Sequence, residues 1–467
     1  MTGRAVVGVD SSTQSCKVVV RDLATGDVVR RATAHHPDGT EVDPRAWVDA
    51  LDRALAEAAG RGDDIVGLAV GGQQHGMVVL DTDGEVVRPA LLWNDTRSSD
   101  AATALVAELS AQEWADATGS VPVASFTVTK LRWFAEHEPD LAARAAAVCL
   151  PHDYLSAHLA GHQDIGALAT DRGDASGTGY WSPATGQYRP DLLELAFGRQ
   201  LVVPRVLPPW EVAGELRPGT IVAAGTGDNM GASLGLGAKR GDVMVSIGTS
   251  GVVAAVADAP TADPTGIVAG FADATGCFLP LACTLNAAQV FTTMCTVLGC
   301  TVEQLSDLAL ASPPGSEGVV LVPYFAGERT PNLPDAHAEL VGMSLANTRP
   351  ANLARAAIEG VLCGLADGLD ALVAHGVEVE RVMLLGGAAR SPAVQAVAAT
   401  VFAADVIVPE PDEYVALGAS LQAARAFAGG DDPGWPSAPH VAVHGSTVPA
   451  VRDQYRGAAA RVAESNR

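Results

Sequence analysis

The first part of the chain alternates apolar β-rich runs with small polar turns and one amphipathic segment. Residues 5–10 and 17–21 flank a short Ser/Thr-rich turn, and this arrangement predicts a β-hairpin. Residues 44–59 are amphipathic, and Asp43 and Pro44 suit the N-cap and the first helical position, which predicts a helix with a capped start. The apolar run 65–70 predicts another strand. Strands that alternate with helices are typical of a layered α/β domain.

The same order returns in the second part of the chain. Residues 242–247 and 252–256 predict two strands around the small-residue turn 248–251. A predicted helix around 350–375 then precedes the strand 382–385, which ends at a Gly-Gly-Ala loop. The repeat predicts that one α/β unit has been duplicated.

The length of 467 residues also favours more than one domain, because a single core rarely grows that large. We expect two duplicated α/β domains, 1–237 and 238–467, with a cleft between them. The glycine-rich stretch 235–240 would serve as the hinge.

Charge and cysteine content narrow the class of protein. The formal net charge of -24 opposes binding to nucleic acid, although a local cradle could still hold a small anion such as ATP. The seven cysteines form no C-x-x-C pair, which indicates free thiols in a reducing compartment. The charge-free stretch 274–302 contains proline and polar residues, so it predicts a strand and a helix and not a membrane span. We expect a cytoplasmic protein that binds neither nucleic acid nor membrane.

Two turns and one loop could hold phosphate or nucleoside groups. The three lysines are each followed by a residue other than Ser or Thr, which excludes a Walker A loop. Hydroxyls and backbone N–H groups in the turn 10–17, beside Asp10, could surround phosphate oxygens, and the turn 248–251 repeats this chemistry without the acid. The loop 386–388 could form a flat floor for a nucleoside. Ordinary polar turns and a tight strand-to-helix loop remain the alternatives.

Asp228 lies in a glycine-rich turn between a predicted strand and a predicted helix. It could cap the helix, act as a general base, or belong to a dinucleotide-binding loop. A dinucleotide fold requires an acidic residue about 20 positions further on. Residues 246–250 contain none, which weakens the case for an NAD-dependent dehydrogenase.

Several motifs in register resemble those of the FGGY carbohydrate kinases, a family within the hexokinase–actin superfamily. The resemblance extends from about Gly8 to Ala424 and depends on four segments, 125–137, 323–331, 338–343 and 352–359. It implies two ribonuclease H-like domains that bind ATP and Mg²⁺. A homodimer is an open alternative to a monomer.

The resemblance also implies roles for individual residues. Asp228 would be the catalytic base, and Asp10 would hold Mg²⁺ through water. ATP would be bound by Ser12, Thr13, Lys17, Gly248, Thr249, Ser250, Gly386, Gly387 and Ala388. The sugar would be bound by Gln74, His75, Trp93, Asn94, Asp95 and Asn229.

The resemblance implies that the phosphoryl acceptor is a pentulose, with D-xylulose as the leading candidate. Residues 72–76 and 92–97 resemble the sugar-contacting segments of family members that phosphorylate D-xylulose, although Gln74 replaces a commoner methionine and Ser12 a commoner glycine. A buried core histidine is the alternative for His75, and a turn residue for Asp95. Ribulose, gluconate and glycerol remain alternative acceptors, and an actin-like ATP-binding assembly or sensor protein is an alternative of another class.

Overall fold

The computed structural model describes residues 3–58 and 64–466, and its contacts divide the chain into two compact units. Unit 1 runs to Ala238 and also includes Asp258–Leu279 and Asp412–Ala438. Unit 2 consists of Lys239–Ala257, Pro280–Pro411 and the chain from Pro439 onwards. Each unit is built on one large mixed β-sheet.

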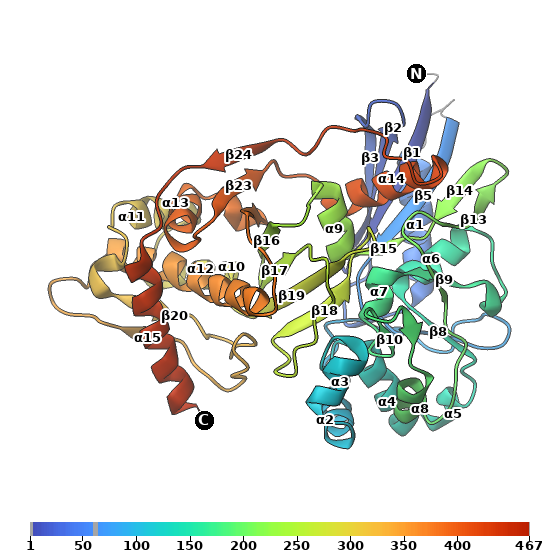
Figure 1. Ribbon diagram of the computed structural model, residues 1–467, viewed down its shortest axis with the longest axis horizontal. Coiled ribbons are helices and arrows are strands. Elements are labelled where there is room, and N and C mark those ends of the chain that lie inside the picture. Colours follow the sequence, from blue (N-terminus) through green and yellow to red (C-terminus); the bar gives the residue numbers. More distant parts are fainter. Residues whose placement is uncertain (1–2, 59–63, 467) are drawn as a thin grey trace. The chain divides into compact units, whose positions relative to one another are not determined.

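The sheet of unit 1 follows from the predicted hairpin. β1 (Arg4–Ser11) pairs antiparallel with β2 (Ser15–Asp22), which pairs antiparallel with β3 (Val28–His35). On its other side β1 pairs parallel with β5 (Asp64–Gly72), and β5 pairs parallel with β14 (Thr220–Ala223). β13 (Val212–Arg217) extends this edge, and β15 (Thr226–Gly227) pairs with the end of β5 (Figure 1).

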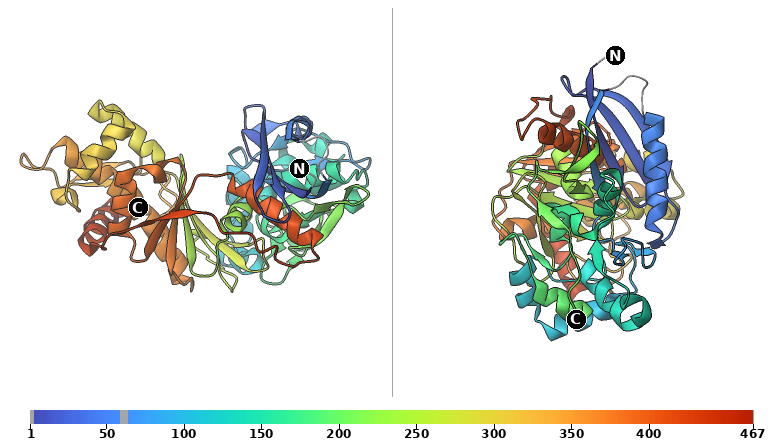
Figure 2. Two further views of the ribbon diagram at one scale, coloured as in Figure 1. Left: turned by 90° about the horizontal axis from the view of Figure 1, so that it is seen from above. Right: turned by 90° about the vertical axis from the view of Figure 1, so that its right-hand side faces the viewer.

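Helices cover both faces of this sheet because side chains alternate along each strand. Val7 and Val9 pack with α1 (Pro44–Ala58) and α6 (Pro151–Leu159) in one core. Val6 packs on the opposite face against α14 (Tyr414–Phe427), which lies beside β1 and β5 (Figure 2). A Cβ on Gly8 would lie 1.8 Å from the carbonyl oxygen of Ala416, so only glycine lets α14 approach this closely.

Unit 2 repeats the strand order and directions of unit 1. β19 (Phe278–Thr284), β17 (Gly251–Ala255) and β16 (Asp242–Ile247) pair antiparallel in that order through residues of unit 2. β16 then pairs parallel with β22 (Arg381–Leu385), and β22 parallel with β23 (Asp405–Pro409). The strands β3-β2-β1-β5-β14 of unit 1 follow the same sequence of directions. This match confirms the predicted duplication.

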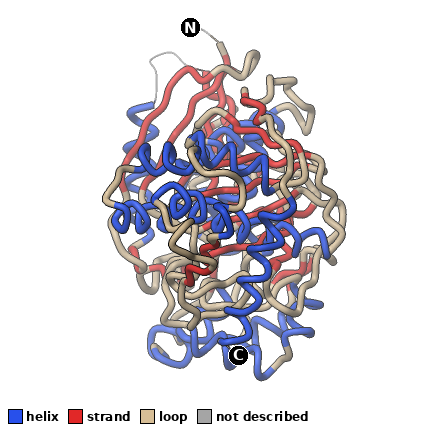
Figure 3. Tube along the Cα trace, turned by 90° about the vertical axis from the view of Figure 1, so that its left-hand side faces the viewer, coloured by secondary structure: helices blue, strands red, loops and turns tan. Residues whose placement is uncertain are grey.

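The remaining elements surround these two sheets (Figure 3). Unit 1 also contains β4 (Glu41–Val42), β6 (Val78–Leu80), β7 (Ala90–Leu91), α2 (Ser99–Glu108), α3 (Ala111–Thr118), α4 (Thr127–His137), α5 (Pro139–Ala142), β8 (Ala147–Cys149), β9 (Ala169–Asp171), α7 (Arg172–Ser176), β10 (Trp181–Ser182), β11 (Gln187–Tyr188), α8 (Pro190–Phe197), β12 (Arg205–Leu207), α9 (Asp228–Leu236), β18 (Val268–Ala272) and a 3-10 turn at Ile165–Ala167. Unit 2 also contains α10 (Ala288–Leu298), α11 (Val302–Leu310), β20 (Val320–Val322), β21 (Glu339–Val341), α12 (Pro350–Ala374), α13 (Pro392–Val401), β24 (His440–Val443), α15 (Pro449–Ser465) and 3-10 turns at Ser316–Gly318 and Gly387–Arg390.

Most of the elements expected from sequence are present. The charge-free stretch forms β19 and α10, as predicted, and none of the helices in residues 3–58 and 64–466 is long and apolar enough to cross a membrane. The predicted helix 44–59 matches α1, except that its last residue lies outside the described residues.

The contacts divide the chain differently from the continuous segments 1–237 and 238–467. Both divisions separate the chain close to Ala238, but two segments of the later half, Asp258–Leu279 and Asp412–Ala438, pack in unit 1. The second of these segments contains α14, which covers β1 and β5 and also contacts α9. The sequence-based boundaries and the cleft therefore stay predictions.

Candidate active site

Asp228 stands at the start of α9, just beyond the strand ends of unit 1. Gly227 is the N-cap, so Asp228 is the first helical residue and not the cap. Its Oδ1 accepts hydrogen bonds from the backbone N–H of Asn229 at 2.7 Å and from Asn229 Nδ2 at 3.0 Å. Burial raises the pKa of Asp228 to about 6, against these hydrogen bonds, which lower it. A carboxylate with this pKa is ionised at neutral pH and basic enough to accept a proton.

Asn229 connects Asp228 to the segment that follows β5. The same Asn229 Nδ2 donates to Gln74 Oε1 at 3.1 Å. Gln74 is buried, and its Nε2 has no hydrogen-bond partner among the described residues. Burying an unpaired amide donor costs about 1–3 kcal/mol, so an acceptor from a ligand would relieve a real penalty. The structure thus brings together the predicted base and two predicted sugar contacts.

His75 is held in a left-handed conformation with φ 66°. Its Nδ1 lies 2.7 Å from the carbonyl oxygen of Gly177, and its ring stacks on Phe126 with centroids 4.7 Å apart. Its carbonyl oxygen accepts a hydrogen bond from Thr127 Oγ1 at 3.0 Å. Strain of this kind persists only where surrounding contacts impose it. His75 is therefore fixed in orientation, next to Gln74.

The first predicted phosphate turn carries an acid, a cation and a second acid. Asp10 is buried, and its Oδ1 lacks a hydrogen-bond partner in the described part of the chain. Lys17 Nζ lies 3.9 Å from Asp10 Oδ2 and 2.6 Å from Glu413 Oε2, on the residue just before α14. Burial raises the pKa of Asp10 to about 7 although Lys17 lowers it, and Asp228 and Glu413 raise it further. An added cation would stabilise the ionised form of Asp10.

The tip of this turn is joined to the second predicted sugar segment. Trp93 Nε1 donates to Thr13 Oγ1 at 2.9 Å, and the Trp93 side chain is 45% exposed. Ser12 Oγ donates to the carbonyl oxygen of Ser15 at 3.2 Å, so the hydroxyl that replaces a commoner glycine closes the turn. The indole face of Trp93 is accessible beside a turn expected to bind phosphate.

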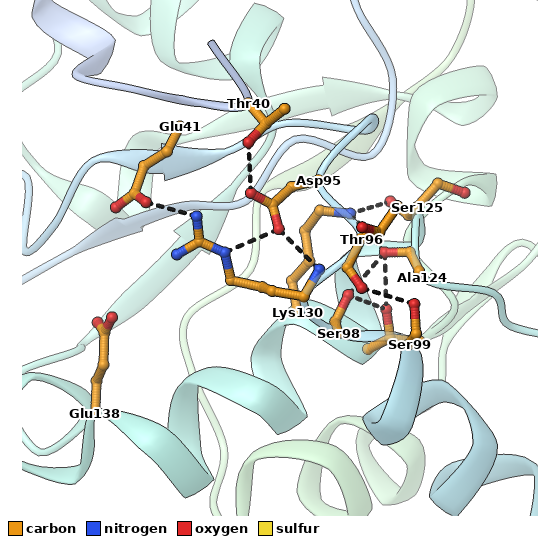
Figure 4. Close-up of polar contacts among 12 residues, drawn as sticks. Thr40, Glu41, Asp95, Thr96, Ser98, Ser99, Ala124, Ser125, Lys130 and Glu138 are labelled. Atoms are coloured by element: carbon orange, nitrogen blue, oxygen red, sulfur yellow. Dashed lines mark hydrogen bonds and ion pairs between the residues drawn. The ribbon is translucent and has the colours of Figure 1, made fainter.

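Asp95 has structural partners within unit 1 (Figure 4). Its carboxylate accepts from Thr40 Oγ1 at 2.8 Å and from Arg97 Nε at 2.8 Å. Burial raises the pKa of Asp95, but the hydrogen bonds from Arg97 and Thr40 outweigh it and lower the pKa below its usual value. Asn94, next to it, is exposed. The geometry therefore agrees with the structural alternative for Asp95 and leaves Asn94 accessible.

The predicted nucleotide elements of unit 2 are open and uncharged. In the second turn Gly248 N donates to the carbonyl oxygen of Ser250 at 3.1 Å, and Thr249 and Ser250 are exposed. Gly386 has φ 88°, and a Cβ there would lie 2.6 Å from the carbonyl oxygen of Ile247, so this glycine is required by packing. A Cβ on Gly387 would meet no described atom within 4 Å. Gly387 thus has open space beside it, between β22 and α13, and its role as a floor for a nucleoside stays a prediction.

Comparison with known proteins decides among the candidate classes. The N-terminal domain model of the FGGY family of carbohydrate kinases matches residues 5–240, and the C-terminal domain model matches residues 243–427. The chain belongs to the FGGY family of carbohydrate kinases. This membership confirms the predicted family and fold and rejects the dehydrogenase and assembly-protein alternatives.

Individual members of the FGGY family are similar to almost the whole chain. The xylulose kinase of Streptomyces coelicolor is 46% identical over 443 residues, which cover 92% of this chain and 89% of that protein. The xylulose kinase of Escherichia coli is 32% identical over 82% of each chain. The crystal structure of xylulose kinase from Bifidobacterium adolescentis has a TM-score of 0.94 and 44% identity, and covers 98% of this chain and 100% of that chain.

In the segment 125–137, the first of the four that carry the family resemblance, the lysine has a structural role within unit 1. Lys130 is fully buried in α4 and donates to the carbonyl oxygens of Ala124, at 2.9 Å, and Ser125. Burial lowers the pKa of Lys130 to about 7, although Asp95 raises it. The lysine thus ties the start of α4 to the loop before it.

Sequence reasoning missed several polar residues at this site. Glu413 pairs with Lys17 from the far end of the chain, and Gln73 is buried with both side-chain polar atoms unpaired among the described residues. Gly71 and Gly72, just before Gln73, indicated a crowded strand end, because glycine within a strand often marks a close approach of other groups. Glu413 gave no such signal, since nothing in the sequence relates it to the first turn.

Proposed function

We propose that this FGGY kinase transfers the γ-phosphoryl group of ATP to D-xylulose, giving D-xylulose 5-phosphate and ADP. The observation that carries the proposal is the hydrogen-bonded series Asp228, Asn229 and Gln74, which places a basic carboxylate next to an unpaired amide donor. Similarity to xylulose kinases over nine-tenths of the chain supports the choice of acceptor.

Asp228 acts as the general base in this proposal. It accepts the proton of the sugar hydroxyl while the hydroxyl oxygen forms a bond to the γ-phosphorus and the bond from that phosphorus to ADP breaks. The two hydrogen bonds from Asn229 fix the carboxylate in one orientation. Burial keeps the carboxylate basic, and ionisation at neutral pH keeps it competent to accept the proton.

The sugar is held by groups that both donate and accept hydrogen bonds. Gln74 Nε2 and the His75 imidazole form hydrogen bonds with hydroxyl groups of the sugar, and the side-chain amides of Asn94 and Asn229 provide further donors and acceptors. The exposed indole of Trp93 covers an apolar C–H face of the sugar. Asp95 contributes by orienting this segment through Thr40 and Arg97, which is a narrower role than direct contact.

The residues proposed to bind ATP contribute backbone and hydroxyl groups in each unit taken by itself. In unit 1 the turn supplies Ser12, Thr13 and Lys17, and in unit 2 the contacts come from the turn Gly248, Thr249 and Ser250 and from the loop Gly386, Gly387 and Ala388. Small residues let the backbone N–H groups approach phosphate oxygens.

The residues of the first turn fit a magnesium ion held through water. Asp10 offers a buried carboxylate oxygen without a partner among the described residues, and no group of three or more His, Cys, Asp or Glu in those residues could hold a metal by itself. Mg²⁺ commonly keeps several waters and takes its other ligands from substrate phosphates. When bound, the ion neutralises charge on the phosphate groups. We place the reaction in the cytoplasm, in agreement with seven free cysteines.

Measurement of ADP formation with a panel of pentuloses, aldoses, gluconate and glycerol tests this proposal. We expect D-xylulose to give the highest kcat/KM and phosphorus NMR to identify D-xylulose 5-phosphate as the product. A higher kcat/KM with gluconate or glycerol, or equal ADP formation without any sugar, would reject the assignment.

A further inference from the structure

A buried cluster of one histidine and three aspartates lies in unit 1 outside the site residues described above. His152 and Asp153 begin α6, Asp171 ends β9, and Asp174 lies in α7, all at most 2% exposed. His152 Nδ1 lies 2.7 Å from Asp174 Oδ2, and its Nε2 lies 3.2 Å from Asp153 Oδ1 and 3.7 Å from Asp171 Oδ1. Such a cluster is costly to desolvate, and apolar residues could fill the same volume. We therefore considered which residues the cluster contacts.

The His152 imidazole is surrounded by carboxylates that favour its protonated form. Burial lowers the pKa of His152, but the charges of Asp153 and Asp174 and the hydrogen bond that His152 donates to Asp174 outweigh it and raise the pKa to about 10. The carboxylates are themselves anchored, since Asp153 accepts from the backbone N–H of Leu150 at 2.7 Å and Asp171 from that of Gly173 at 2.7 Å. The imidazole ring can therefore support its neighbours as a rigid element.

Those neighbours are the glycines that lead into the two halves of the acceptor site. A Cβ on Gly225 would lie 2.4 Å from His152 Cδ2, and a Cβ on Gly72 would lie 2.8 Å from His152 Cβ. Gly225 comes three residues before Asp228, and Gly72 two residues before Gln74. His152 thus packs directly against the ends of both chain segments.

Gly225 is also held from another side. It has φ 84°, which only glycine adopts without strain. Its N–H donates to Gln422 Oε1 at 3.1 Å, and its carbonyl oxygen accepts from Gln422 Nε2 at 2.7 Å. The turn before Asp228 is therefore fixed by His152 together with a buried amide from α14.

The short helix that carries Asp174 contacts the same two segments. Gly177, just after α7, accepts from His75 Nδ1 at 2.7 Å. A Cβ on Gly173 would lie 2.6 Å from Met230 Cγ, in α9 two residues after Asp228. Asp174 consequently links His152 to His75 and to α9.

We propose that His152, held by Asp153 and Asp174, is a positioning residue that sets the separation between the sugar segment Gln73–His75 and the base Asp228. The proposal rests on the proposed function, because it gives these two segments their roles. A displacement of about 1 Å between a base and its substrate can cost about 100-fold in rate. Loss of His152 therefore acts on kcat and leaves ATP binding intact.

The main test is His152→Gln, which removes the charge and the ring, with Arg21→Gln as the matched control. Arg21 is a partly buried cation of unit 1 that donates to the carbonyl oxygen of Gly26 and lies over the Trp435 ring. It also reaches Leu417 and Ser420 of α14, but its hydrogen bonds among the described residues include none to 72–76 or 224–230. We expect kcat for D-xylulose to fall about 10- to 100-fold in His152→Gln, with KM for ATP within twofold of wild type. Arg21→Gln should keep kcat within twofold. An unchanged kcat in His152→Gln, or equal losses in both variants, would overturn the proposal.

Hydrogen exchange separates this proposal from the proposed function, because it needs no turnover. Amides of residues 72–76 and 224–230 should exchange faster in His152→Gln and at the wild-type rate in Arg21→Gln. Unchanged exchange in both segments would overturn the positioning role even if the wild type phosphorylates D-xylulose. Conversely, a wild type that phosphorylates no pentulose would reject the proposed function while the exchange result still decides the positioning role.

A second variant covers the case in which His152→Gln does not fold. Asp174→Asn keeps the size of the side chain and one oxygen for the His152 N–H, but it removes the charge. We expect a smaller loss of kcat, about 3- to 10-fold, with faster exchange at 224–230. Wild-type kcat together with wild-type exchange would overturn the proposal.

Discussion

The two turns predicted to bind phosphate occupy equivalent positions in the two sheets but have very different surroundings. The turn between β1 and β2 in unit 1 contains Asp10 and Lys17, and Lys17 forms an ion pair with Glu413. The turn between β16 and β17 in unit 2 contains no charged residue, and its Thr249 and Ser250 are exposed. The shared topology gives both units a turn at this place, and the two turns differ in the charge of their side chains.

The difference leads us to expect different roles for the two turns. In unit 1 a hydrogen bond from Trp93 to Thr13 joins the turn to the segment predicted to bind sugar. Burial raises the pKa of Asp10, and the charge of Asp228 raises it further. Changes to unit 1 should therefore alter the chemistry of the reaction. In unit 2 the residues proposed to hold the nucleotide offer only backbone groups and hydroxyls, so changes there should alter ATP binding alone.

The largest expected effect comes from Asp228→Asn in unit 1. An amide cannot accept the sugar proton, so kcat should fall by about 1,000-fold while affinity for ATP, measured by calorimetry, stays within twofold. Asp164→Asn removes a carboxylate that caps an exposed turn in the same unit, and it should keep wild-type kcat. A loss smaller than tenfold in Asp228→Asn would show that another group is the base.

The next effect in size is expected from Asp10→Asn, in the first turn. Loss of this carboxylate should lower kcat by about 100-fold and raise the Mg²⁺ concentration needed for half-maximal rate, because the proposed site would lose the carboxylate expected to hold the ion. The measurement is a magnesium titration at saturating ATP and sugar. An unchanged magnesium requirement would remove Asp10 from the metal site and weaken the contrast between the two turns.

Gln74→Met should have a moderate effect that is visible in the pH profile. Gln74 orients Asn229, whose hydrogen bonds lower the pKa of Asp228, so its loss should raise that pKa. The acidic limb of the kcat profile should then move upward by about half a pH unit, the equivalent of one weakened hydrogen bond. If only KM for the sugar rises and the limb stays in place, Gln74 is a sugar contact without influence on the base.

Thr249→Val, in unit 2, should have the smallest effect. It removes one hydroxyl from the second turn, so KM for ATP should rise about 2- to 10-fold with kcat and KM for the sugar unchanged. Steady-state kinetics with each substrate varied in turn decides this. A change in the sugar KM would contradict the division of roles between the units.

The sequence was sufficient for the local architecture. The strands around residues 5–21 and 242–256 were predictable because apolar β-branched runs flank polar turns, and the helices α1 and α12 because prolines mark their starts. The order of the motifs along the chain was enough to identify the family. These features depend on neighbours in the chain, which a sequence displays directly.

Contacts between distant parts of the chain were not predictable. Lys17 and Glu413 are 396 positions apart. The helix α14 belongs to unit 1 because Gly8 allows β1, and Gly418 allows α9, to approach its backbone closely. Asp95 was expected to contact sugar, but its carboxylate binds Thr40 and Arg97. The cluster around His152 combines residues from three elements, so nothing in its local sequence reveals that it packs against Gly72 and Gly225.

The central claim is that a partly buried carboxylate in unit 1, Asp228, takes the proton of the sugar. The most direct test is kcat for D-xylulose phosphorylation by the wild type as a function of pH, at saturating ATP and Mg²⁺. Because the base works only when ionised and its pKa is raised to about 6, the rate should be constant above that pH and fall about tenfold per pH unit below it. A rate that stays constant from pH 8 down to about pH 5 would contradict the account.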